Sequence, residues 1–186
     1  DVLLHQSGLK GWIPFYVNAI QAGFDSLFSK SNNDTFDIMV AENLYMRSGY
    51  QEDIWKSIME SEVQETPRYI YSDLGFYFFK ELVENVTGLS LDQYLKKSFY
   101  DPMGLTKTTY NPLGNINKNE LVPTENDQVF RKQVIHGHVH DPGAAMLGGV
   151  AGHAGLFSNA KEISVISQML MNGGEYGGKK YLKSST

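Results

Sequence analysis

Residues 71–86 read Tyr-Ser-Asp-Leu-Gly-Phe-Tyr-Phe-Phe-Lys-Glu-Leu-Val-Glu-Asn-Val, a short polar motif followed directly by an apolar pattern. Large apolar residues recur every four positions in this stretch, at Leu74, Phe78, Leu82 and Val86. Such spacing predicts an amphipathic helix, and Gly88 provides an end for it. We therefore expect Tyr71 and Asp73 to lie at the start of a packed helix that fixes their positions.

Helical spacing of apolar residues also predicts helices over residues 15–28, 52–60 and 90–99. A last helix is expected to begin at Ser158, because serine is a favoured N-cap residue. Its inward-facing side chains would be Ile163, Ile166 and Leu170. The large aromatic residues are interpreted as core residues, namely Trp12, Trp55 and the cluster Phe76 to Phe79.

Few segments of the chain favour strands. Residues 36–46 are expected to be extended or irregular, and a strand is expected within residues 128–140. Residues 176–182 suggest a glycine-centred turn between two short extended pieces. The predicted fold class is therefore predominantly α with a few short strands (α+β), and the length of 186 residues suits one domain.

Composition narrows the choice of function. The net charge is −5 and only three residues are arginine, which argues against nucleic acid as a partner because its phosphates require clustered cations. No apolar run approaches the roughly 18 residues of a membrane-spanning helix, so no membrane span is expected. Cysteine is absent, so disulfides contribute nothing to the fold.

Tyr71 and Asp73 are the residues best placed for chemistry. A phenol can remove the proton of a serine hydroxyl only if its pKa of ~10 is lowered, usually by nearby cations. Asp73 could accept hydrogen bonds from a substrate amide or from a lysine. The alternative is structural, because a tyrosine before a helix is commonly a packing residue and an aspartate there is commonly an N-cap.

Two Ser-x-x-Lys strings compete for the role of nucleophile. Ser7 and Lys10 lie in glycine-rich turn sequence, where no helix would place them on one face. Ser158 and Lys161 lie at a helix start, which offers backbone N–H groups, but an ordinary serine N-cap with an exposed lysine explains the pattern as well.

A zinc site is a further alternative. His136, His138 and His140 alternate, so in a strand they would share one face, with Asp141 and His153 as additional ligands. The glycine-rich run that contains His153 lacks the Gly-Lys-Ser/Thr of a phosphate-binding loop and is better explained by close backbone packing.

Several blocks of the chain resemble the β-lactamase-related serine hydrolases, which include class C β-lactamases, penicillin-binding DD-peptidases and related esterases. Leu3-Leu4-His5-Gln6-Ser7-Gly8-Leu9 resembles their Leu-Leu-x-His-x-Ser-Gly-Leu stretch, and Tyr71-Ser72-Asp73 resembles their Tyr-x-Asn motif. The other matching blocks lie in the same order along nearly the whole chain, at residues 101–108, 123–141, 148–158 and 173–179.

The resemblance implies a helical lobe of the β-lactamase/transpeptidase-like fold, with its main sheet largely missing, as a single incomplete domain over residues 1–186. In the family, a Ser-x-x-Lys motif precedes these blocks and a Lys/His-Thr-Gly strand follows them. The nucleophilic serine and its lysine are therefore expected to lie outside this chain. By the same resemblance Tyr71 is the general acid/base and Asp73 a substrate or lysine contact, and the cleft candidates are Ser72, His153 and Gly155.

The implied function is acyl-enzyme hydrolysis of a β-lactam, ester or cell-wall peptide, with no cofactor and no metal, in the periplasm or cell envelope. This chain alone is expected to be inactive and to self-associate through an uncovered apolar face. Asp73 stands where many members of the family have asparagine. This difference changes the hydrogen bonding, because an ionised carboxylate accepts hydrogen bonds but cannot donate them. The alternatives are a non-catalytic relative that binds cell wall or a partner, and a zinc hydrolase that uses His136, His138 and His140.

Overall fold

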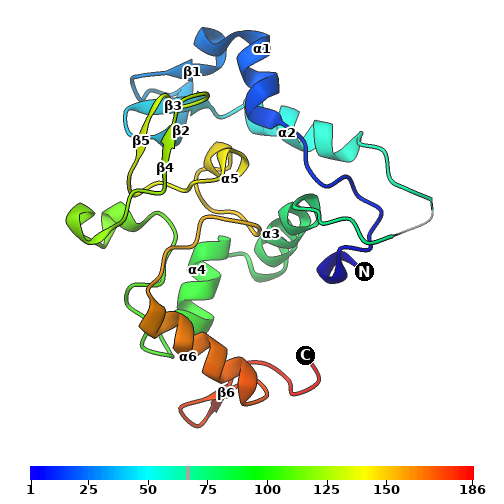
Figure 1. Cartoon of the computed structure of the whole chain (residues 1–186), viewed down its shortest axis with the longest axis vertical. Coiled ribbons are helices and arrows are strands. Elements are labelled where there is room, and N and C mark those ends of the chain that lie inside the picture. Colours follow the sequence, from blue (N-terminus) through cyan, green and yellow to red (C-terminus); the bar gives the residue numbers. More distant parts are fainter. Residues whose placement is uncertain (66–67) are drawn as a thin grey trace.

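The computed structural model describes residues 1–65 and 68–186 (Figure 1). Its helices are α1 (Phe15–Leu27), α2 (Tyr50–Met59), α3 (Leu74–Thr87), α4 (Leu91–Leu95), α5 (Pro142–Met146) and α6 (Ala160–Met171). Helix α4 continues as a π-helical turn, η2 (Lys96–Tyr100), and short 3-10 turns occur at η1 (Val2–Leu4), η3 (Pro112–Gly114) and η4 (Lys118–Glu120). The helices predicted from apolar spacing are all confirmed.

In the residues that the structure describes, the strands form three small antiparallel sheets. The first has the order β1-β3-β2, from β1 (Phe28–Ser29), β2 (Phe36–Ala41) and β3 (Leu44–Arg47). The second pairs β4 (Glu125–Asp127) with β5 (Gln133–Ile135), and the third pairs β6 (Glu175–Tyr176) with β7 (Lys179–Lys180). The fold class predicted from sequence, helical with few short strands, is therefore confirmed. No helix in the described residues is long and apolar enough to cross a membrane.

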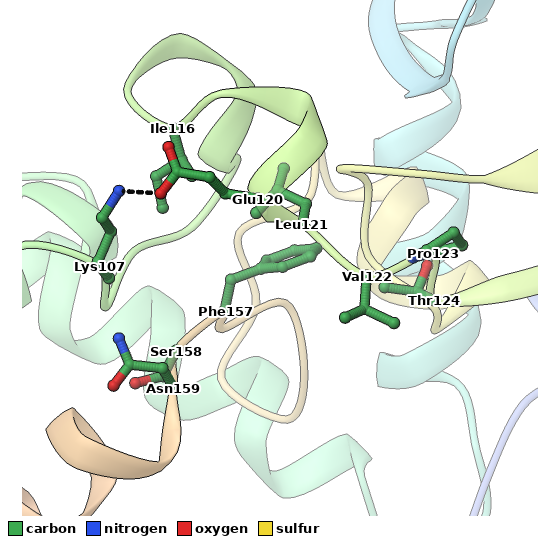
Figure 2. Close-up of a pocket in the computed structure, with 10 residues that line it drawn as sticks. All are labelled: Lys107, Ile116, Glu120, Leu121, Val122, Pro123, Thr124, Phe157, Ser158 and Asn159. Carbon is green, nitrogen blue, oxygen red and sulfur yellow. Dashed lines mark hydrogen bonds and ion pairs between the residues drawn. The ribbon is translucent and has the colours of Figure 1, made fainter.

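Two local predictions need correction. Residues 128–140 contain a strand as expected, β5, but it ends at Ile135, so the three histidines that follow do not share a strand face as predicted. The N-cap of α6 is Asn159, whose side chain accepts a hydrogen bond from the Glu162 amide, and not Ser158. The Ser158 hydroxyl is instead 2.7 Å from the Thr108 hydroxyl. Figure 2 shows Ser158 and Asn159 at the start of α6.

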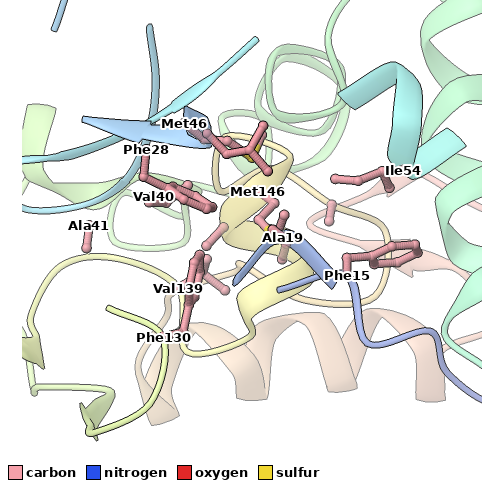
Figure 3. Close-up of a cluster of buried hydrophobic side chains, with 14 of the residues drawn as sticks. Phe15, Ala19, Phe28, Val40, Ala41, Met46, Ile54, Phe130, Val139 and Met146 are labelled. Atoms are coloured by element: carbon pink, nitrogen blue, oxygen red, sulfur yellow. The ribbon is translucent and has the colours of Figure 1, made fainter. Parts of the chain in front are cut away.

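The main core joins α1, α2 and α5 to the first sheet (Figure 3). Phe15 and Ala19 of α1 are buried in the same cluster as Val40, Met46 and Ile54, and α5 contributes Met146. Leu74 and Tyr77 bring the first turn of α3 into this cluster. The start of α3, where the Tyr71 motif ends, is thus fixed by the largest core of the molecule.

A second, smaller core lies at the other end of the chain. Tyr100, Met103, Leu105 and Met169 are buried together between η2, the turn after it and α6. Figure 1 shows α4 and α6 at the end of the molecule away from the three-stranded sheet. The described part of the chain therefore has two packed regions, and α3 leads from the first toward the second.

The four-residue repeat on α3 does not form a buried stripe. Leu74 is fully buried, but Phe78, Leu82 and Val86 are 36%, 55% and 76% exposed. The reason is geometric, because a step of four residues turns about 40° too far around an α-helix, so the repeat rotates away from the core. Three other residues expected to be inside are also exposed: Trp12, Ile163 and Leu170.

Candidate functional site

The segment that carries Tyr71 is held by the N-terminal segment of the chain. The Ile70 amide donates to the His5 carbonyl, and the Asp73 amide donates to the Gly11 carbonyl. Ser72 adds two bonds, because its amide donates to Nδ1 of His5 at 3.0 Å and its hydroxyl donates to the Lys10 carbonyl at 2.6 Å. Four hydrogen bonds therefore fix the backbone on both sides of Tyr71.

The Tyr71 side chain itself is exposed. Its solvent-accessible fraction is 65%, and its ring centroid lies 4.4 Å from that of His5. Since Nδ1 of His5 accepts the Ser72 amide, the proton of a neutral His5 ring is on Nε2. His5 is not among the site residues predicted from the sequence, although it occupies the histidine position of the Leu-Leu-x-His stretch. In the structure, the His5 ring holds the backbone next to Tyr71 by accepting a hydrogen bond from the Ser72 amide.

Asp73 occupies the N-cap position of α3, but its side chain does not cap the helix. The carboxylate accepts no hydrogen bond from any residue in 1–65 or 68–186, and it is half-buried. Burial raises the pKa of Asp73; the charges of His153 and His5 oppose this rise and that of Asp141 adds to it. The structural alternative, an ordinary N-cap aspartate, therefore does not describe this side chain.

A second polar pair lies close to Asp73. Asp141 is the N-cap of α5, and its Oδ1 accepts hydrogen bonds from the Ala144 amide and from Nε2 of His153 at 3.0 Å. Burial opposes ionisation of Asp141, but the hydrogen bonds from His153 and Ala144 prevail and lower its pKa. The His153 ring stacks on Tyr77, with ring centroids 4.5 Å apart. A pair formed by the buried His153 ring and the partly exposed Asp141 carboxylate thus lies against the first turn of α3.

The other two cleft candidates are committed to packing contacts. Ser72 is buried, and both its amide and its hydroxyl are used to bind the N-terminal segment. Gly155 is buried where a side chain would collide with the Gly149 carbonyl and would crowd the Tyr110 ring. Their roles as substrate contacts remain predictions, and the structure places Tyr71 and Asp73 as the more accessible pair.

The three alternating histidines do not converge on one point, since the rings of His136 and His140 contact different backbone carbonyls. Nε2 of His136 lies 2.9 Å from the Leu121 carbonyl, Nδ1 of His140 lies 3.3 Å from the Thr124 carbonyl, and burial lowers the pKa of His138. Within the part of the chain that the structure describes, no three His, Cys, Asp or Glu side chains converge as metal ligands. The donor geometry expected for a zinc hydrolase is therefore not found in these histidines.

Ser158 lines a cavity of about 460 Å³, which is also lined by Lys107, Glu120 and Phe157 (Figure 2). Neither Tyr71 nor Asp73 contributes to its lining. The Ser158 hydroxyl is part of a chain in which Thr108 donates to Glu162, so its proton is directed to Thr108. Ser7 lies in non-helical sequence after η1, so Lys10 is not one helical turn away from it.

Comparison with known proteins identifies relatives for the whole chain. The family model described as Beta-lactamase matches residues 1–185. A protein of Escherichia coli (strain K12) named "Putative D-alanyl-D-alanine carboxypeptidase" is 35% identical over 196 residues, covering 99% of this chain and 41% of that protein. A protein of the same name from Salmonella agona (strain SL483) is 33% identical over 198 residues, covering 100% of this chain and 41% of that protein.

The fold also has a counterpart among solved structures. The octameric penicillin-binding protein homologue from Pyrococcus abyssi aligns with a TM-score of 0.55 and 16% identity, covering 99% of this chain and 36% of that one. The similarity of fold thus extends along the whole chain. The chain spans 41% of the length of the two curated relatives described above.

Proposed function

This chain belongs to the Beta-lactamase family, and we propose that it forms the helical lobe and one cleft wall of a serine hydrolase that works through an acyl-enzyme. The observation that carries the proposal is that Tyr71 and Asp73 lie two positions apart on one segment and both have free side-chain groups. One is an exposed phenol and the other a carboxylate without a hydrogen-bond partner in the described residues, on a segment fixed by four hydrogen bonds. A fixed backbone with free functional groups is what a preorganised site requires.

In the proposed reaction, Tyr71 exchanges a proton with the nucleophilic serine and the leaving group. For this role the phenol must be deprotonated near neutral pH, which requires a cation beside it in the assembled site. The family lysine is that cation in our proposal. Asp73 receives an N–H donor, from the lysine or from the substrate, because an ionised carboxylate can only accept.

The proposed substrate is a peptide that ends in D-alanine, as the names of the two relatives suggest. A β-lactam or an ester is the alternative acyl substrate. A cell-wall peptide places the reaction in the periplasm or cell envelope. No cofactor is required for acyl transfer by a serine.

We propose further that the serine and its lysine are supplied by sequence outside residues 1–186, so that this chain alone is inactive. The coverage of 41% of the relatives supports this proposal, as does the absence of a helical Ser-x-x-Lys at Ser7. The exposed apolar side chains of α3 also fit a lobe that packs against further structure.

Labelling with a fluorophosphonate probe tests the assignment. We expect no adduct on the folded 186-residue chain and one adduct per molecule on the full-length protein. A stoichiometric adduct on the short chain would place the nucleophile inside it and overturn the proposal. An unlabelled, folded full-length protein would favour the alternative of a non-catalytic relative that binds cell wall or a partner.

Replacing Tyr71 tests its role in proton transfer. In the full-length enzyme, Tyr71→Phe should lower kcat/KM by about 10²–10⁴-fold, the usual contribution of a general acid/base. Tyr69→Phe is a matched control, since Tyr69 is 66% exposed and also contacts the His5 ring. Equal rates for the two variants would remove Tyr71 from the mechanism.

The exposed face of α3 supports a proposal about the isolated chain. Phe78, Leu82 and Val86 lie on it, and exposed apolar residues of this size favour association. The 186-residue chain should therefore sediment as a dimer or larger species, and a Leu82→Gln/Val86→Gln variant should sediment as a monomer. A monomeric parent chain at high concentration would contradict this.

A further inference from the structure

A cavity of about 390 Å³ lies beside strand β2, and neither Tyr71 nor Asp73 contributes to its lining. Three consecutive residues of β2 line this cavity, namely Asp37, Ile38 and Met39. Successive side chains of a strand point to opposite faces of the sheet, so consecutive residues line one cavity together when it follows the edge of the strand. The cavity therefore runs along the edge of β2.

The edge of β2 presents backbone groups to this cavity. In the described residues β2 is an edge strand, because its sheet has the order β1-β3-β2 and only β3 pairs with it. Alternate backbone N–H and C=O groups of such a strand point away from its partner. Those of Asp37, Ile38 and Met39 form no hydrogen bond outside the sheet with the described residues. An edge of this kind can pair with an added extended segment.

His138 adds a polar side chain without a partner to the same cavity. The residue is only 9% exposed, and its ring nitrogens form no hydrogen bond with the described residues. Unlike Nδ1 of His153, these nitrogens are not sealed from solvent, so a ligand in the cavity can reach them. Burial lowers the pKa of His138, so at pH 7 its neutral ring has one nitrogen that donates and one that accepts. Such a ring matches the carbonyl and the N–H of a peptide backbone.

The remaining lining favours a cation on an aliphatic stem. Asp37 is exposed and carries the only full charge among the described residues that line the cavity, and none of the described residues forms an ion pair with it. Met39 and Leu113 are 43% and 40% exposed, so both offer apolar surface to a ligand. Lysine and arginine side chains combine a long aliphatic stem with a cationic end. The net charge of −5 also favours a cationic partner.

We propose that the edge of β2 binds an extended peptide segment of another molecule, which adds to the sheet as a strand and places a lysine or arginine side chain against Asp37. The aliphatic stem of that side chain packs on Met39 and Leu113, and His138 forms a hydrogen bond with the peptide backbone. This site is separate from Tyr71 and Asp73, so the inference does not depend on the proposed acyl-transfer function.

Calorimetric titration of the full-length protein with short peptides tests the site. The probe is acetyl-Val-Lys-Val-amide, and three related peptides each change one feature: lysine to norleucine, lysine to glutamate, or backbone N–H to N-methyl. Loss of the cation should weaken binding about two- to fivefold, as for an exposed ion pair. N-methylation removes the donors that pair with β2 and should abolish binding. Equal affinity of the N-methylated peptide would overturn strand addition, and failure of the probe to bind would overturn the whole inference.

Substitutions of the protein test the assigned contacts. Asp37→Lys should reverse the charge preference, so that the glutamate peptide binds more tightly than the lysine peptide. Asp34→Lys is the matched control, because it changes the net charge equally from an exposed position outside the lining. His138→Phe removes the ring nitrogens and should weaken binding about two- to tenfold. An unchanged preference in Asp37→Lys would overturn the role of Asp37.

A blocking variant locates the bound peptide. Gly114→Leu adds a side chain to the lining where it meets no atom within 4 Å, so it should abolish binding and leave the fold intact. Gly49→Leu is the matched control, with equally open surroundings outside the cavity. Equal affinities of the two variants would place the peptide elsewhere and overturn the inference.

Comparison of the 186-residue chain with the full-length protein identifies the source of the bound segment. Binding by the short chain alone would mean that another segment of the same protein occupies the edge of β2, and would overturn the assignment to another molecule. A full-length protein that binds the probe but is not labelled by the fluorophosphonate would support this inference while refuting the proposed function.

Discussion

At the start of α6, the Glu162 carboxylate accepts hydrogen bonds from the Thr106 and Lys107 amides and from the Thr108 hydroxyl, at 2.6 to 3.0 Å. At the start of α3, the Asp73 carboxylate accepts none from the described residues. Burial raises the pKa of both groups, but in Glu162 the hydrogen bonds outweigh it and the pKa is lowered. A carboxylate at a helix start is therefore a structural hydrogen-bond acceptor in Glu162, whereas in Asp73 it is free to accept a hydrogen bond from another group.

The largest loss of stability is expected at Glu162, because both oxygens of its carboxylate accept hydrogen bonds. Glu162→Gln places an amide against backbone donors and should lower the free energy of unfolding by about 2–3 kcal/mol. Chemical denaturation measures the loss, and Glu175→Gln, at an exposed position, is the control. A change below about 0.5 kcal/mol, the usual effect of a surface substitution, would show that the hydrogen bonds to Glu162 are not what separates the two regions.

A smaller loss is expected from the glycine that brings the His153 loop to α3. Gly152→Ala would place its side chain against the Phe76 carbonyl and should cost about 2 kcal/mol through overpacking. Gly114→Ala is the matched control, since an added methyl group there meets no atom within 4 Å. Equal melting temperatures for the two variants would mean that the loop does not pack as described.

Ser72→Ala tests whether the loop at Asp73 is held by its neighbours. The variant leaves the Lys10 carbonyl without its 2.6 Å donor and should cost about 1 kcal/mol. Ser164→Ala removes a bond of the same length on an exposed helix and should cost less. A larger loss in the Ser164 variant would contradict the importance of the N-terminal segment.

The smallest effect, and one of opposite sign, is expected at Asp73 itself. Because burial raises its pKa in the folded state, the ionised carboxylate costs stability near neutral pH. Asp73→Asn should therefore stabilise the protein at pH 7, by about 0.5 kcal/mol or less. The gain should vanish as the pH falls below the pKa of the unfolded carboxyl group, where Asp73 is protonated in both states. Melting temperatures across this pH range measure the difference, and a loss of stability at pH 7 would contradict it.

Much of the fold could be predicted from local pattern. Apolar spacing located the helices, and the glycine turn at residues 176–182 is the β6–β7 hairpin. The failures arise where local pattern and tertiary packing disagree. The repeat on α3 rotates from fully buried Leu74 to 76% exposed Val86, because packing at its first turn decides which side faces inward.

The candidate site was predicted in part. The Tyr71 motif pointed to the loop that the structure exposes, but His5 and Asp141 had to be found from contacts far apart in the sequence. Asp141 was predicted as a possible zinc ligand and as part of a block that resembles the family, whereas in the structure it caps α5 and binds His153. The structural role of Arg131 also could not be predicted from the sequence. Its side chain is buried and hydrogen-bonded to Asp127 and to two backbone carbonyls.

The hydrogen bonds that hold the Tyr71 loop have a kinetic consequence. His5 and Lys10 join Ser72 across 67 and 62 positions of sequence, so a long chain segment must close before these bonds can form. Closing such a loop loses entropy before its contacts repay the loss, whereas the helices on either side need only local contacts. During refolding the helices therefore form early and the geometry around Tyr71 is completed late.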